Sequence, residues 1–286
     1  MDNEHDRDQM HPSEYFESVL RMTRDLRNAS ITLSFREARF LVDAYYAMQR
    51  DRIRAAHQTR TLVANEEPHD IISWVQDQRH TLEGQVAKAL DAYSASLEYG
   101  VWARSIVGIG PIISAGLAAN IDISKAPTVG HVWRFAGLDP TVKWEKGKKR
   151  PWNGSLKRLC FLIGESFVKV SNNNRDVYGK VYASRKITET RNNEALMFKD
   201  QAALSLASKN WSDDTVAKSC YEKGMLPPAR IHLRAQRVAV KLFLSHYHHV
   251  LHEVTYGVAP PKPYIVTRDP LHNFIVPPNW PMVAKD

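Results

Sequence analysis

One stretch, RSIVGIGPIISAGLAANIDI at residues 104–123, constrains the fold of this chain more than any other. Residues 105–121 form a run of 17 without charge, interrupted by Gly-Ile-Gly-Pro at 108–111. A single buried helix tolerates neither the glycines nor the proline cheaply. The run is also shorter than the roughly 20 apolar residues that cross a bilayer, and it contains Ser114 and Asn120. We therefore expect two short helices joined at a tight corner, and no membrane span.

The glycine corner fits one phosphate-binding motif better than two others. A P-loop needs a lysine after its second glycine, and a dinucleotide fingerprint needs a third glycine at position 113; both are missing. A helix-hairpin-helix needs only Gly-apolar-Gly between helices. There Gly108 and Gly110 would admit a phosphate, Ile109 would anchor the corner, and the amides from Ile112 onward would face the anion. The alternative is a plain Gly-Pro corner between core helices.

The net charge of +8 is unevenly distributed. Residues 1–100 hold 12 Lys and Arg against 17 Asp and Glu, or −5, whereas residues 101–286 hold 27 against 14, or +13. Such a basic second part favours a polyanionic partner, most often nucleic acid, over a merely solubilising surface.

A cationic loop is expected between two helices at 141–153. Its two tryptophans can stack on bases or ribose, or else anchor the loop in the core. Further basic positions follow in the next helix and in the last long helix. The predicted nucleic-acid contacts outside the corner are Lys143, Trp144, Lys146, Lys148, Lys149, Arg150, Lys157, Arg158, Arg234 and Arg237, with Trp152 beside them.

The hydrophobic periodicity predicts a mainly α fold. We expect a flexible arm over 1–33 and a long, coiled-coil-like helical hairpin over 34–100, opened by a Ser34–Glu37 capping box. A helical domain containing the helix-hairpin-helix is expected over 101–256, and an extended Pro-rich tail over 257–286. The hairpin has a narrow apolar stripe, so it packs either on a second copy, giving a homodimer, or on its own C-terminal domain.

The run VGIGPIISAGLAANIDISKAPTVGHVWRFAGLDP, the basic loop and NGSLKRLCFLIGESF together resemble the C-terminal domain of the IS-one-ten class of insertion-sequence transposases. The resemblance covers roughly residues 101–191. It implies a DNA-binding helix-hairpin-helix domain, which in that family follows a RuvC-like nuclease domain with four acidic residues and a helical coiled-coil region.

Two departures from the family bear on catalysis. Residues 1–33 are too few for the nuclease domain, so no metal-dependent cleavage by this chain alone is expected, and Mg²⁺ would enter only through a nuclease partner acting in trans. The family's nucleophilic serine is missing from the loop after Asp139-Pro140. Thr141 and Ser155 are the nearest hydroxyl substitutes, and they are our only catalytic candidates.

Several other residues carry weaker signals. His248 and His252, with Glu253 beside them, have the spacing of a metal pair but lack the His-Glu-x-x-His order, and we expect no metal site. Tyr178 and Tyr182 are expected to pack rather than react. The two cysteines are too few for a disulfide framework, and Cys160 is expected in the core.

These observations predict a DNA-binding, transposase-like protein of a mobile element or phage that grips the nucleic-acid backbone and lacks the family's own cleavage chemistry. The alternative is an active transposase or site-specific recombinase that uses an unrecognised hydroxyl or a nuclease in trans. Structured RNA stays open as a partner, as does a structural role in assembly. The acidic N-terminus lacks a signal-peptide pattern, so we expect a cytoplasmic, nucleoid-associated protein of a bacterium.

Overall fold

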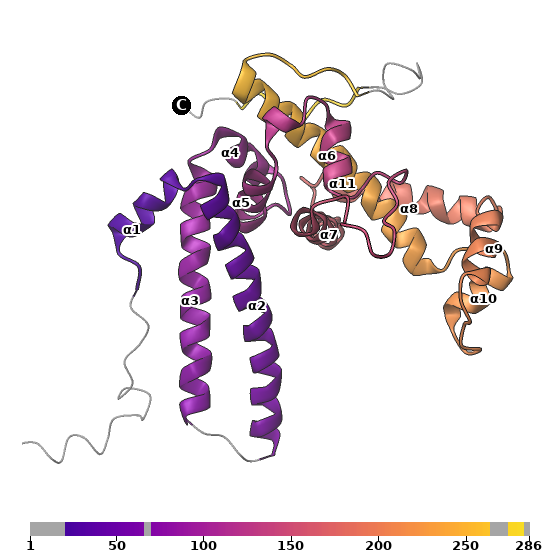
Figure 1. The fold of residues 1–286 in the computed structure, drawn as a ribbon, viewed down its shortest axis with the longest axis horizontal. Helices are drawn as coiled ribbons and strands as arrows, with labels where there is room; N and C mark the ends of the chain where they lie inside the picture. Colours follow the sequence, from indigo (N-terminus) through magenta and orange to yellow (C-terminus); the bar gives the residue numbers. More distant parts are fainter. Residues whose placement is uncertain (1–20, 66–69, 264–273, 283–286) are drawn as a thin grey trace, which may run out of the picture.

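The computed structural model describes residues 21–65, 70–263 and 274–282. These residues contain eleven α-helices, two short 3-10 helices and no strand, which confirms the mainly α prediction (Figure 1). The elements, in chain order, are α1 (Arg24–Ala29), η3 (Ser30–Thr32), α2 (Phe35–Ala64), α3 (Asp70–Ala95), α4 (Glu98–Ser105), α5 (Pro111–Asn120), η4 (Ile123–Lys125), α6 (Val129–Phe135), α7 (Gly154–Lys169), α8 (Tyr178–Glu194), α9 (Lys199–Ala207), α10 (Val216–Glu222) and α11 (Pro228–Tyr256).

Helices α2 and α3 form a long hairpin that extends away from the remaining helices (Figure 1). The expected capping box opens α2, because the Ser34 side chain accepts from the Glu37 amide while the Glu37 carboxylate accepts from the Ser34 amide. Farther along, the guanidinium of Arg52 donates twice to the carboxylate of Glu83, which is buried between the helices. This bidentate contact fixes the alignment of α2 with α3.

The base of the hairpin packs on the chain's own α5. Ala38 and Val42 of α2 and Leu90 of α3 lie in one buried cluster with Ala115 and Ala118 of α5. Small side chains on α5 let the three helices approach closely. The base of the hairpin thus packs on the C-terminal region of its own chain, and the homodimer stays a prediction.

The first described residues differ from the flexible arm expected over 1–33. Residues 24–32 form α1 and η3, which lie on α3: the Ser30 hydroxyl donates to the Ala89 carbonyl, and Arg27 pairs with Asp91 at 3.7 Å. Thr23 caps α1 with its side chain. Residues 1–20 of the expected arm lie outside the described residues.

The main core surrounds α7, which lies between α5 and the long helix α11. Phe167 of α7 stacks on Tyr178 of α8 at 4.9 Å between ring centroids, and both contact Phe243 of α11 edge-on. Trp102 of α4, fully buried, stacks on the same Phe243. Helix α11 thus holds α4, α6, α7 and α8 together, and Cys160 of α7 is buried in this core as expected.

A smaller cluster and an extended tail complete the fold. Residues 195–226 contain α9 and α10, which pack around Ala202, Tyr221 and Leu226. The described tail segments contain no helix or strand, as expected for their prolines. The tail crosses α4, where the Pro278 carbonyl accepts from the Trp102 indole at 2.8 Å.

Candidate nucleic-acid interface

The glycine corner joins α4 and α5 as the sequence predicted, but its first glycine, Gly108, packs against the end of α7. Gly108 has φ +95°, which glycine adopts freely. A Cβ there would lie 3.1 Å from the Ser166 hydroxyl and 3.2 Å from a methyl group of Val170, both near the end of α7. The Gly108 carbonyl also accepts from the Ser166 hydroxyl at 2.5 Å. Gly108 is therefore required for the approach of the corner to α7.

The remaining corner residues divide into an anchor and an open side. Ile109 is buried in the main core, as expected of the anchor. Gly110 is the N-cap of α5, and a Cβ placed on it would meet nothing within 4 Å. Pro111 follows with no amide hydrogen, so the first donors at this helix end are the amides around Ile112. Only this side of the corner could meet a phosphate.

Helices α5 and α7 run in opposite directions, which separates the corner from the cationic loop. Gly108 lies against Ser166, whereas Gly116 packs on Leu159 and Asn120 lines a cleft together with Gly154. Ser166 and Gly154 are 12 residues apart on α7, or about 18 Å. The corner and the loop therefore lie at opposite ends of α7 and do not form one contact site.

The loop before α7 is built on local hydrogen bonds. Gly137 follows the last turn of α6 with φ +67°, and a Cβ there would lie 2.8 Å from the Trp152 ring. Asp139 then accepts from both the amide and the hydroxyl of Thr141, an arrangement that lowers the pKa of the Asp139 carboxyl. The Asn153 side chain caps α7 by accepting from the Leu156 amide.

The two tryptophans organise the loop, and one of them stays half exposed. Trp144 donates through its indole to the Lys148 carbonyl at 2.7 Å and meets Trp152 edge-on at 6.5 Å. The Arg150 guanidinium lies over the Trp144 ring, 5.1 Å from its centroid, and 50% of the Trp144 surface is accessible. Trp144 can thus offer a face to a base, and Trp152 is the anchor.

The predicted cations of the loop are exposed. Lys148 pairs with Glu145 at 2.9 Å, so its charge is balanced locally. The others have no ion-pair partner in the part of the chain that the structure describes; they are Lys143, Lys146, Lys149 and Arg150. These four are available to phosphates.

The first half of α11 extends this surface. Arg230, Arg234, Arg237 and Lys241 repeat at spacings of four, three and four, so they lie along one face. Desolvation first, and then the cations Arg234 and Arg230, lower the pKa of Arg237. In the same way, desolvation followed by Arg237 and Arg150 lowers the pKa of Lys157. Burial is the main cause of both shifts, and the neighbouring cations add to it.

One predicted contact in this row is already neutralised. The Arg234 guanidinium donates to Glu189 at 2.7 Å, and Arg185 donates to the other carboxylate oxygen. Burial raises the pKa of Glu189, but these two cations outweigh it, so the pKa is lowered overall. Arg234 therefore serves mainly as a structural partner of a buried carboxylate. Arg237 is the freer of the two arginines.

The two hydroxyl candidates have different surroundings. Thr141 is engaged by Asp139, as described above. Ser155, in the first turn of α7, donates to Asp43 of α2 at 3.4 Å. Ser155 and Asp43 line a cleft that also contains Arg158, whose guanidinium lies 5.5 Å from the centre of the Tyr46 ring.

The histidines of α11 have separate partners. His248 contacts the Ala126 carbonyl, His249 pairs with Glu253, and His252 contacts the Val258 carbonyl. His246 lies between the Tyr178 hydroxyl and the Ile275 carbonyl. Among the described residues, no group of three or more His, Cys, Asp or Glu has metal-binding geometry.

The tyrosines Tyr178 and Tyr182 are both buried. Tyr178 packs in the main core, in agreement with its expected role. Tyr182 contacts His232 at 2.8 Å, and the other ring nitrogen of His232 lies 3.6 Å from Glu165. This chain of polar groups links α8, α11 and α7.

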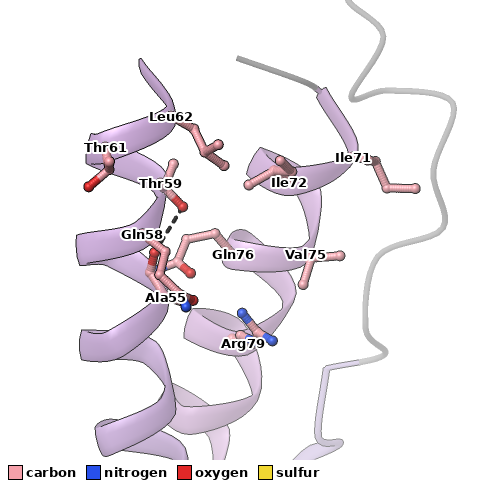
Figure 2. A pocket seen from close by; sticks show the side chains of 10 residues that line it. All are labelled: Ala55, Gln58, Thr59, Thr61, Leu62, Ile71, Ile72, Val75, Gln76 and Arg79. Carbon is pink, nitrogen blue, oxygen red and sulfur yellow. Dashed lines mark hydrogen bonds between the residues drawn. The ribbon is translucent and has the colours of Figure 1, made fainter. Parts of the chain in front are cut away.

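Another cavity lies away from this surface, at the far end of the hairpin (Figure 2). About 610 Å³ is open between α2 and α3, mostly against apolar side chains such as Leu62, Ile72 and Val75. Arg79, the one cation in its wall, pairs with Asp51 at 3.0 Å. Among the described residues that line this cavity, the one cation is therefore already paired with an acid.

Three cations at the α7 end were missed in the sequence: Arg50, Arg230 and Lys241. The spacing of Arg230 and Lys241 relative to Arg237 was a usable signal, because it places them on one helix face. Arg50 of α2 lines the same cleft as Arg150 and Arg158. Nothing in its local sequence could indicate that contact, which spans a hundred residues.

Comparison with known proteins adds no relative. No protein-family model matches the chain, and neither the curated proteins nor the solved structures gave a significant match. Within the described residues, no helix has both the length and the apolar character needed to span a membrane.

Proposed function

We propose that this chain is a DNA-binding protein, related in kind to transposase C-terminal domains, that grips the nucleic-acid backbone without cleaving it. The contact surface is the N-terminal end of α7: the loop 141–153, Lys157, and the α11 row ending at Lys241. The observation that carries the proposal is the group of exposed loop cations without an ion-pair partner among the described residues, beside Lys157 at the start of α7; they are Lys143, Lys146, Lys149 and Arg150.

The chemistry of this surface favours a backbone over a base sequence. Flexible lysines and arginines on a loop neutralise phosphates, and such contacts position a strand without reading it. The half-exposed Trp144 adds a stacking face, which is useful where bases are unpaired. We infer that branched or partly single-stranded DNA is the preferred ligand, with structured RNA as the competing one.

The test is a salt series. Binding of fluorescent duplex, branched and single-stranded DNA, and of a hairpin RNA, is measured by anisotropy between 50 and 300 mM salt. We expect a linear fall of log affinity with log salt, with a slope near −0.9 for each phosphate contact on duplex. Affinity that is absent, or independent of salt, overturns the proposal.

A second candidate function, strand transfer as an active transposase or recombinase, is favoured by the Ser155–Asp43 contact. A carboxylate beside a serine hydroxyl is the kind of base that a nucleophile needs. Ser155 would attack a phosphorus, Asp43 would take the hydroxyl proton, and the ester bond to the departing strand would break to release that strand's hydroxyl.

The two candidates differ in one product. Incubation with branched DNA and Mg²⁺, followed by denaturing electrophoresis, detects a covalent protein–DNA adduct. An adduct that Ser155→Ala abolishes and Thr141→Ala retains supports strand transfer. No adduct in the wild type, with intact salt-dependent binding, supports the non-cleaving function.

A further inference from the structure

A polar cleft of about 450 Å³ lies between α2 and α7, beside the surface proposed above. Its walls include three arginines from two distant parts of the chain: Arg50 of α2, Arg150 of the loop and Arg158 of α7. None of the three has an ion-pair partner among residues 21–65, 70–263 and 274–282. The volume falls within the range of sites for small organic ligands.

Two of the three arginines, Arg150 and Arg158, have contacts that position their guanidinium groups. The Arg150 guanidinium lies directly over the first turn of α7, because a Cβ on Gly154 would come within 2.8 Å of it. Arg158 is positioned above the Tyr46 ring at 5.5 Å. Burial raises the pKa of Tyr46 to about 12, so its hydroxyl remains a neutral donor at the edge of the cleft. A guanidinium fixed in this way matches a planar or bidentate oxyanion.

Two further features define the ligand. The N-terminus of α7, which has 16 residues, faces the cleft at Gly154 and Ser155, and its cap uses only the Leu156 amide. Asn120, 4% exposed, lines the same cleft, and its Oδ1 has no hydrogen-bond partner in the described part of the chain. That oxygen needs a donor, which a bare phosphate dianion lacks and a sugar hydroxyl or base amino group supplies.

The charge of the cleft indicates which phosphate it takes. Asp43, the acid that lines the cleft, accepts weakly from Ser155, so the three arginines leave two net positive charges. A phosphomonoester carries close to two negative charges at pH 7, whereas an internal phosphodiester carries one. The terminal phosphate of a nucleotide, with its sugar beside it, therefore fits both the charge and the unpaired Asn120.

We propose that the cleft between α2 and α7 binds a terminal nucleotide through its phosphomonoester, held by Arg50, Arg150 and Arg158 at the N-terminus of α7. That this nucleotide belongs to a DNA end rests on the function proposed above. A free nucleoside monophosphate shares the chemistry, and the experiment separates the two sources.

The experiment compares two 12-nucleotide single strands that differ only in a 5′-phosphate. We expect the phosphorylated strand to bind the wild type at least 10-fold more tightly at equal salt. Arg50→Ala should reduce this ratio below 3 while both strands keep their salt dependence. Arg60→Ala, the same change farther along α2, is the matched control and should leave the ratio unchanged. Thermal unfolding verifies that each variant is folded, and Arg158→Ala replaces Arg50→Ala if the latter is not.

The outcomes separate this inference from the function it extends. Equal affinity of the two strands for the wild type, with normal salt dependence, overturns the cleft and leaves DNA binding intact. If neither strand binds, DNA binding fails, and calorimetry with deoxynucleoside monophosphate and with inorganic phosphate decides on the cleft. Monophosphate binding that Arg50→Ala abolishes then supports it with the free nucleotide as its source. No heat with either probe overturns it.

Discussion

The two ends of α7 are both surrounded by helices and loops, but they differ in packing and in charge. At the C-terminal end, Gly108, Phe167 and Tyr178 pack closely. A methyl group added at Gly108 would force neighbouring side chains to move. At the N-terminal end, Arg150 and Lys157 are held beside other cations and remain accessible. One end is closely packed, and the other has a cluster of accessible cations.

The contrast teaches that a phosphate-binding motif and a phosphate-binding surface need not coincide. The Gly-Ile-Gly corner has the sequence of a helix-hairpin-helix, yet its first glycine contacts Ser166 and Val170. The surface with unbalanced positive charge lies about 18 Å away along α7. In the proposed function, the corner therefore stabilises the fold and the loop binds DNA.

The largest effect is expected at the packed end. Gly108→Ala introduces a Cβ at positive φ and within 3.2 Å of two side chains, so we expect the free energy of unfolding to fall by about 3 kcal/mol in urea titrations. Gly110→Ala, two residues on, is the control, and it should cost less than about 1 kcal/mol because its Cβ meets nothing. Equal losses for both variants would contradict this division of roles.

The next effect is expected at the cationic end. Replacing Lys146 and Lys149 by Ala should lower DNA affinity about 30-fold at 0.15 M salt, or about 2 kcal/mol, and reduce the salt slope by about 2, because two phosphate contacts are lost. Anisotropy titrations measure both. The control Lys88→Ala/Lys125→Ala removes the same charge elsewhere and should change affinity little. A similar loss in the control would mean that net charge alone drives binding.

The smallest expected effect is a pH dependence of the free energy of unfolding, which comes from His246 at the packed end. Burial lowers the pKa of His246 from 6.5 to about 4, so the folded chain keeps this ring neutral while the unfolded chain protonates it. Stability from this group is complete above pH 6.5 and is lost as the pH falls toward 4. By pH 5.5 the loss is about 1 kcal/mol.

Urea titrations at pH 7 and 5.5 measure this loss, and His246→Asn should remove most of it. The salt slope of DNA binding should be the same at both pH values while the chain stays folded, because His246 lies away from the loop. A change in slope without a change in stability would place the sensitive group at the cationic end instead.

Local signals predicted much of the fold. The capping box at Ser34 and the separate helices on either side of the loop are set by residues within one or two turns, and the structure has both. Residues 24–32 were missed because a short helix is stable only when it packs on another element, here α3.

The site was less predictable, for physical reasons. The exposed lysines of the loop were found because charge and exposure go together. The role of Gly108 was not, because it depends on which helix packs behind it, and that helix begins 46 residues later. Ser155 meets Asp43 across 112 residues, and no local pattern encodes such a contact. Arg234 was misjudged because its partner, Glu189, comes from another helix.

Lysine footprinting on α7 and its loop tests the central claim most directly, because one helix has a reporter at each end. The chain is acetylated with and without saturating branched DNA, and each site is quantified by mass spectrometry. The account predicts that DNA protects Lys143, Lys146, Lys149 and Lys157 and leaves Lys169, exposed at the other end of the helix, as reactive as before. Protection of Lys169 with the loop lysines left reactive would contradict it and return the contact to the glycine corner.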